Sequence, residues 1–162
     1  MKFSSKVRLG LIGLVAAASA FAAMPANAAG GLTITGTGGI SPGLTQAGGA
    51  QTYTFSGTGG GAGVDNTGTP QAGTFTCTLS GDDTIGTLTS GAGSINGSCN
   101  TPCGTVGVSG SYTRTGGTVT AGGSITSGCF SGESFSADCS FTPTSPPPVV
   151  SYVVHCEVTL TP

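Results

Sequence analysis

Apolar and hydroxyl-bearing residues alternate along most of the chain. The segments LTIT (32–35), TYTF (52–55) and FTCTL (75–79) each place an apolar or aromatic residue at every second position, with threonine between them. A side-chain period of two is that of a β-strand, and the β-branched and aromatic content favours strands too. Past residue 28 we find no helical periodicity long enough to predict a helix. The pattern therefore predicts an all-β protein.

The spacing of these segments predicts the fold class. About nine short strands follow one another at near-regular intervals, joined by turn sequences such as SGDD (80–83) and SGES (131–134). This spacing favours an antiparallel β-sandwich of Greek-key or immunoglobulin-like type over a barrel. A glycine-rich stretch at 56–73 predicts a long loop, and a proline-rich stretch at 142–150 predicts a connector before the last strand. We expect one domain over 29–162.

The last strand contains the only histidine of the chain, His155, next to Cys156. Alternation places Cys156 with Tyr152 and Val154 on one face, and His155 with Glu157 on the other. Because strand neighbours point in opposite directions, His155 and Cys156 cannot bind one metal ion or form one nucleophile–base pair. We interpret His155 as a half-exposed imidazole beside a carboxylate. The apolar character of this strand favours a central strand buried on both faces, with a strand exchanged between subunits as the alternative.

The first residues predict export. Basic residues within 1–8 precede an apolar run over 9–23, and a small-residue cleavage pattern follows at 26–28. These are the parts of a secretory signal peptide, which we predict over 1–28. We expect a bacterial protein that is secreted, either to the periplasm or to the extracellular space. We also expect no membrane span in the mature chain.

Charge narrows the range of partners. After the signal peptide the chain keeps Arg114 as its only basic residue, against six acidic residues. A protein that binds nucleic acid or anionic lipid needs several basic groups to neutralise phosphates. We therefore exclude both as main partners, and the partners that remain are another copy of the chain or a cell-surface molecule.

Cysteine content predicts a disulfide framework. An even number of cysteines in an exported chain of this size indicates disulfide bonds, and three bridges allow fifteen pairings. We favour a local Cys99–Cys103 bridge, a Cys129–Cys139 bridge closing a hairpin, and a Cys77–Cys156 bridge between strands. Zinc bound by the thiolates of CNTPC (99–103) is the less favoured alternative. Alternation within FTCTL, ADCSF and HCEV places Cys77, Cys139 and Cys156 on buried faces. The six candidates are Cys77, Cys99, Cys103, Cys129, Cys139 and Cys156.

Other candidate sites are weaker. Asp82 and Asp83, with Asp65 and Asn66, supply oxygen ligands for calcium, but the spacing matches no calcium loop and solvated turns are favoured. Ser109 does not lie in a nucleophile elbow, and a chain without tryptophan has few stacking platforms for sugars. We predict no catalytic residue, no metal ion and no cofactor.

These exclusions leave a secreted, non-catalytic structural or interaction domain as the first functional prediction. The alternative is a small-molecule carrier, and an extracellular hydrolase comes last. In its acidic, Gly/Ala/Thr/Ser-rich, disulfide-bonded composition the mature chain loosely resembles the enediyne-binding apoproteins of the neocarzinostatin type. That resemblance implies an apolar pocket that holds a small molecule.

Overall fold

The computed structural model describes residues 30–162, so the signal peptide predicted over 1–28 lies outside the described residues. Eight long strands make up nearly all of this part of the chain. No helix within 30–162 is long and apolar enough to cross a membrane. The strands are β1 (Gly30–Leu44), β2 (Gln51–Val64), β3 (Pro70–Asp83), β4 (Ser90–Thr101), β5 (Gly104–Thr115), β6 (Thr118–Ser127), β7 (Ser134–Pro143) and β8 (Val149–Thr161).

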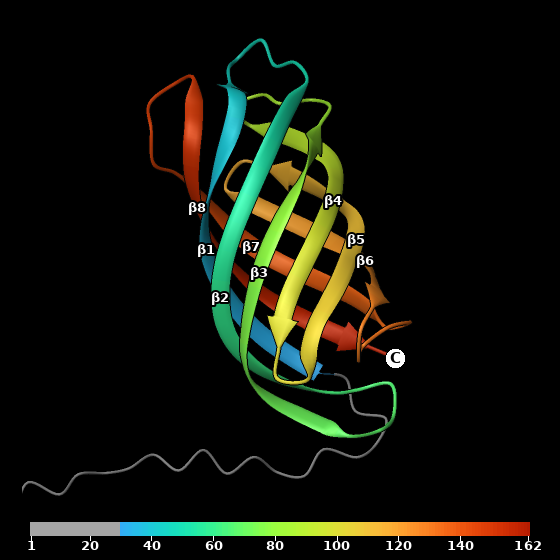
Figure 1. The fold of residues 1–162 in the computed structure, drawn as a ribbon. Helices are drawn as coiled ribbons and strands as arrows, with labels where there is room; N and C mark the ends of the chain where they lie inside the picture. Colours follow the sequence, from blue (N-terminus) through green and yellow to red (C-terminus); the bar gives the residue numbers. More distant parts are fainter. Residues whose placement is uncertain (1–29) are drawn as a thin grey trace, which may run out of the picture.

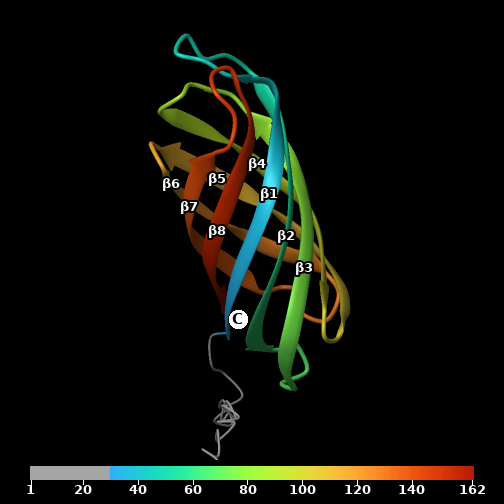
Figure 2. The same cartoon turned by 90° about the vertical axis from the view of Figure 1, so that its left-hand side faces the viewer.

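The strands form a closed barrel (Figure 1). Each strand pairs antiparallel with the next along the chain, and β8 pairs with β1 to complete the circle, as the view of Figure 2 also shows. The prediction of an all-β antiparallel fold is confirmed. The predicted sandwich of about nine short strands is wrong, because eight strands of 10 to 15 residues are long enough to tilt and coil until the first meets the last.

The glycine-rich stretch at 56–73 is strand where a loop is predicted. β2 continues to Val64 and β3 begins at Pro70, so only 65–69 forms the connection. Within β2, Gly57 faces the interior, and a Cβ there would overlap the ring of Phe55 and crowd Ile34. Only glycine fits at this position, because the ring of Phe55 occupies the space that a side chain would need. It is not a sign of a flexible loop.

The last strand is also placed differently from its prediction. The proline-rich connector narrows from 142–150 to 144–148, because β7 ends at Pro143 and β8 begins at Val149. β8 pairs on both edges within the chain, with β1 and with β7. Its outward face, which includes His155, is exposed, so burial on both faces is wrong. A barrel wall has only one buried face, whatever the apolar content of a strand.

Hydroxyl groups cover the outer wall. Thr35 on β1, Thr58 on β2 and Thr76 on β3 lie side by side in register, and all three are exposed. The hydroxyls of Thr58 and Thr76 are 3.3 Å apart. Such cross-strand threonine pairs stabilise a sheet through β-branched packing and hydrogen bonds. The alternation seen in the sequence thus becomes a polar outer wall around an apolar interior.

Three disulfides link strands and loops that are distant in the sequence, which confirms the prediction of three bridges. Two of them join register partners on adjacent strands, one between β3 and β4 and one between β7 and β8. The third joins the β4–β5 turn to the β6–β7 loop. The pairs are Cys77–Cys99, Cys139–Cys156 and Cys103–Cys129.

All three predicted pairings are wrong. A disulfide forms only where two Cβ atoms approach within about 4 Å. In this protein the barrel register decides which cysteines do so, and closeness in the sequence does not. The pairings that the structure overturns are Cys99–Cys103, Cys129–Cys139 and Cys77–Cys156.

One end of the barrel is closed by an aromatic plug. Phe130, in the loop between β6 and β7, is only 1% exposed and stacks at 6.3 Å from Phe75 of β3. The preceding residue, Cys129, is bonded to Cys103 across this end. The disulfide therefore holds the loop that carries the plug in place.

Candidate functional site

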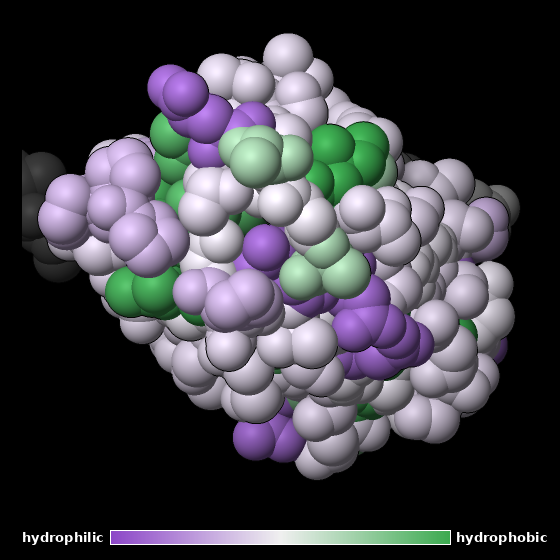
Figure 3. Space-filling model, turned by 90° about the horizontal axis from the view of Figure 1, so that it is seen from above, coloured by the Kyte–Doolittle hydropathy of each residue, from purple (hydrophilic) through white to green (hydrophobic). Residues whose placement is uncertain are grey.

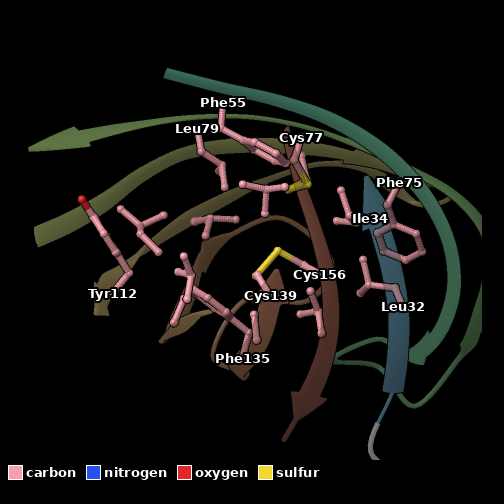
Figure 4. A pocket seen from close by; sticks show the side chains of 18 of the residues that line it. Leu32, Ile34, Phe55, Phe75, Cys77, Leu79, Tyr112, Phe135, Cys139 and Cys156 are labelled. Carbon is pink, nitrogen blue, oxygen red and sulfur yellow. A yellow bond between two sulfur atoms is a disulfide. The ribbon is translucent and has the colours of Figure 1, made fainter. Parts of the chain in front are cut away.

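A cavity of about 190 Å³ lies inside the barrel. Inward-facing side chains from all eight strands line it, and nearly all of them are apolar. Figure 4 shows Phe55, Leu79 and Phe135 reaching into this space from different strands. Eight-stranded barrels have an interior that side chains just fill or that holds one small ligand. In this barrel the side chains leave part of the interior unfilled.

Inward glycines make room for rings from neighbouring strands. The ring of Phe55 lies over Gly36, and the ring of Tyr152 lies over Gly38. A Cβ at either position would overlap these rings, so packing requires glycine at both.

Two disulfides line the cavity on opposite walls, since β3 and β4 lie four strands away from β7 and β8 around the barrel. Figure 4 shows the Cys139–Cys156 bridge facing the space below Cys77. The prediction that Cys77, Cys139 and Cys156 occupy inward faces is confirmed. Cys99 and Cys103 belong to different disulfides, so neither keeps a thiolate for zinc.

Three tyrosines bring hydroxyl groups to the cavity wall. Tyr53 donates to the carbonyl oxygen of Ser94 at 2.5 Å, and Tyr152 donates to that of Thr54 at 2.7 Å. The ring of Tyr112 packs edge-on against Tyr53, with centroids 5.2 Å apart. Burial raises the pKa of each phenol, and nearby charges, including the Asp83 carboxylate, raise those of Tyr53 and Tyr112 further. All three remain neutral hydrogen-bonding groups at physiological pH.

Asp83 ends β3 at the same end of the cavity and is only 4% exposed. Its Oδ1 accepts hydrogen bonds from the backbone N–H groups of Ile85, Gly86 and Ala92, at 2.9, 2.7 and 3.2 Å. Three backbone donors compensate a buried carboxylate well. The turn expected at this position, with its Asx hydrogen bond, is present in the bond from Ile85, but Asp83 is buried and not solvated.

The structure separates the residues that sequence reasoning grouped as calcium ligands. Asp82 points outward and is exposed, whereas Asp83 points inward. Asp65 and Asn66 lie in the loop before β3, at the opposite end of that strand. A strand of this length keeps the two groups far apart.

Arg114 faces the cavity from β5 and is also 4% exposed. Its guanidinium donates to the carbonyl oxygens of Thr87, Leu88 and Ser90, at 2.5, 3.1 and 2.9 Å. The guanidinium carbon also lies 5.0 Å from the centre of the Phe141 ring. Burial lowers the pKa of Arg114, and the charge of Asp83 opposes this shift. The only arginine within residues 30–162 thus anchors the β3–β4 loop.

Gly91 of β4 lies between these two charged side chains. It pairs with Arg114 in the register, and a Cβ at Gly91 would collide with Oδ2 of Asp83 and lie 3.3 Å from Nε of Arg114. Glycine on the middle strand therefore lets a carboxylate from β3 and a guanidinium from β5 approach each other.

The other candidate residues lie on the outer wall. His155 is exposed, and its Nδ1 is 2.7 Å from the hydroxyl of Thr35. Glu157 is exposed on the same face, which confirms the predicted division of this strand into two faces. Ser109 donates its hydroxyl to Oδ1 of Asn96 at 3.0 Å, on the wall that faces away from the cavity.

Two acidic residues, Asp65 and Glu133, lie in loops at the end of the barrel where Phe130 is buried. Asp65 accepts hydrogen bonds from the side-chain hydroxyl of Thr67, from the backbone N–H groups of Thr67 and Thr69 and from the side chain of Gln71, at 2.6 to 2.9 Å. These bonds lower its pKa to about 2. Glu133, 6% exposed, has a raised pKa because of burial and the charge of Asp65.

Before the structure, only the loose resemblance to the neocarzinostatin-type apoproteins implied an apolar pocket, and nothing predicted its charged end. The signal for the charged end is the place of Asp83 and Arg114, which follow apolar residues on the inward faces of β3 and β5. Comparison with known protein families, with curated proteins and with solved structures finds no match for this chain.

Proposed function

We propose that this protein is an exported carrier that holds one small, largely apolar molecule inside its barrel. The observation that carries the proposal is the cavity of about 190 Å³ with its apolar lining. An engineered apolar cavity of about 150 Å³ in another protein binds benzene. By that comparison the barrel accommodates a ligand of about six to ten non-hydrogen atoms.

The energetic cost of the cavity favours this function over a purely structural one. Empty core volume costs about 24 cal/mol per Å³, so a void of about 190 Å³ costs on the order of 4 kcal/mol. A domain that only coats or assembles gains nothing from that cost. The structural or interaction module and the hydrolase stay predictions from the sequence.

The compartment follows from the disulfides and the predicted export signal. Three disulfides suit an oxidising environment, such as the periplasm or the extracellular space. We place the carrier there, in a bacterium, where it would take up or release its ligand outside the cytoplasm.

Binding of p-xylene to the mature protein tests the proposal. At a free concentration ten times the dissociation constant, a ligand that binds only the folded state adds about 1.4 kcal/mol to the free energy of unfolding. We expect a saturable increase in melting temperature, and NMR shifts at inward residues. A ligand of this size is expected to bind with a dissociation constant of about 1 μM to 1 mM.

Two neighbouring substitutions make the test specific. Ala121 lines the cavity, so Ala121→Met should fill it and abolish p-xylene binding. Thr120 points outward, so Thr120→Met should leave binding unchanged. Binding that survives in Ala121→Met, or no binding to the unaltered protein, would contradict the carrier function.

A further inference from the structure

The polar end of the cavity has hydrogen-bonding atoms to spare. Oδ1 of Asp83 accepts three backbone hydrogen bonds, and the terminal nitrogens of Arg114 donate to loop carbonyls. Oδ2 of Asp83 and Nε of Arg114 instead face the space over Gly91. Within residues 30–162, no fully buried side-chain nitrogen or oxygen lacks a partner. The two spare atoms therefore border accessible volume.

Tyr112 adds a hydroxyl to this end. It follows Gly110 and precedes Arg114 on the inward face of β5, and its ring packs on Tyr53. In Figure 4 its hydroxyl oxygen lies at the edge of the cavity, away from the disulfides. The Tyr53 hydroxyl donates to Ser94, whereas the Tyr112 hydroxyl lies beside the Asp83 carboxylate, which adds to burial in raising the pKa of Tyr112. Tyr112 is therefore the phenol of this pair that belongs to the same polar group as Asp83.

The charges at this end balance. One carboxylate and one guanidinium face the same space, and both are 4% exposed. A carboxylate ligand would meet Asp83, and an ammonium ligand would meet Arg114, in a site where water screens little. Either would also bring an uncompensated charge into an apolar cavity. A neutral group that both donates and accepts a hydrogen bond fits both atoms.

We propose that the ligand is a neutral phenol or alcohol whose apolar body fills the barrel and whose hydroxyl bonds to Asp83, Arg114 and Tyr112. The inference rests on the proposed carrier function and adds to it the chemical class of the ligand. The ligand hydroxyl donates to Oδ2 of Asp83 and accepts from Nε of Arg114 or the hydroxyl of Tyr112.

Four probes of matched shape test the inference by isothermal titration calorimetry: p-xylene, p-cresol, 4-methylbenzoate and 4-methylbenzylammonium. A hydrogen bond to a charged group is stronger than one between neutral groups and more than repays its desolvation cost. We expect p-cresol to bind at least tenfold more tightly than p-xylene, and both ions to bind more weakly than p-cresol. Equal affinity for p-cresol and p-xylene, or tighter binding of either ion, would overturn the inference and leave the carrier function standing. No binding of any probe would overturn both.

Conservative substitutions at the polar end of the cavity test where the ligand hydroxyl binds. We expect Tyr112→Phe and Asp83→Asn to reduce the preference for p-cresol over p-xylene by at least threefold. Tyr53→Phe is the matched control, because its hydroxyl is engaged by Ser94, and it should keep the preference. If Asp83→Asn does not fold, Tyr112→Phe decides alone. An unchanged preference in Tyr112→Phe would contradict the assigned position.

Discussion

Gly38 on β1 lies directly beneath the phenol ring of Tyr152 on β8, its register partner across the seam that closes the barrel. A Cβ at Gly38 would overlap the ring and its hydroxyl oxygen. That hydroxyl donates to the carbonyl oxygen of Thr54 on β2, at 2.7 Å. One side chain therefore spans three strands at the point where the ends of the sheet meet.

Gly38→Ala should consequently destabilise the protein. The added methyl group must displace a buried ring that is fixed by a hydrogen bond, and overpacking of this kind costs about 1–3 kcal/mol. Gly39→Ala is the control, since a Cβ there meets its nearest atoms at 3.6 and 3.7 Å, which is ordinary contact. Urea unfolding measures both. Equal stability of the two variants would show that the ring moves aside without cost.

Arg114→Lys should loosen the β3–β4 loop. Lysine keeps the charge but cannot reproduce the planar fork that donates to Thr87, Leu88 and Ser90. Loss of these bonds to buried carbonyls is expected to cost about 2–4 kcal/mol. Hydrogen exchange should accelerate over 84–89 and remain unchanged over 65–69, the loop between β2 and β3. Uniform acceleration over both loops would mean that Arg114 stabilises the whole barrel.

Removing the Cys103–Cys129 bridge should release the β6–β7 loop that carries Phe130. The cysteines are 26 residues apart, and a bridge closing such a loop contributes about 2–4 kcal/mol. We expect the double substitution to alanine to lower the free energy of unfolding by that amount and to expose Phe130.

Digestion of the protein without reduction should give linked peptides for the three observed cysteine pairs. Peptides linking Cys99 to Cys103 would contradict the structure.

Asp65 should make stability depend on pH in the acid range. Its pKa is about 2 in the folded state against 3.8 ordinarily, so the stabilisation is complete above pH 4 and lost as the pH falls toward 2. Asp65→Asn should flatten the dependence of urea midpoint on pH between 5 and 2. An unchanged slope would mean that other carboxylates cause the acid sensitivity.

The same substitution should act on Glu133. The charge of Asp65 contributes to the raised pKa of Glu133, although burial is the larger cause. We therefore expect Asp65→Asn to lower the pKa of Glu133, measured by NMR titration of its carboxyl carbon. The pKa should still remain above the ordinary value for glutamate.

Two glycines show how far the fold was predictable. Gly57 and Gly59 carry no periodic signal of their own, so the sequence pattern ended a strand that in fact continues through both. What keeps them in the strand is their register with β1 and β3, together with the Phe55 ring over Gly57 and the β1 backbone close to Gly59. Neither influence is visible along the chain.

The same reasoning applies to the candidate site. The two faces of 151–160 were predictable, because alternation is a local property of extended backbone. That Asp83 and Arg114 share one space was not, because their meeting depends on strand order, register and a glycine on the strand between them.

By itself the sequence determined the period of two, the inward positions of Cys77, Cys139 and Cys156, and the hydroxyl-rich outer face. Those features follow from local backbone geometry and side-chain polarity. Only the tertiary structure decided that the sheet closes into a barrel, which cysteines pair, and that a cavity with one charged end remains inside. Closure, pairing and empty volume each depend on distances between residues far apart in the chain, and those distances are set by packing.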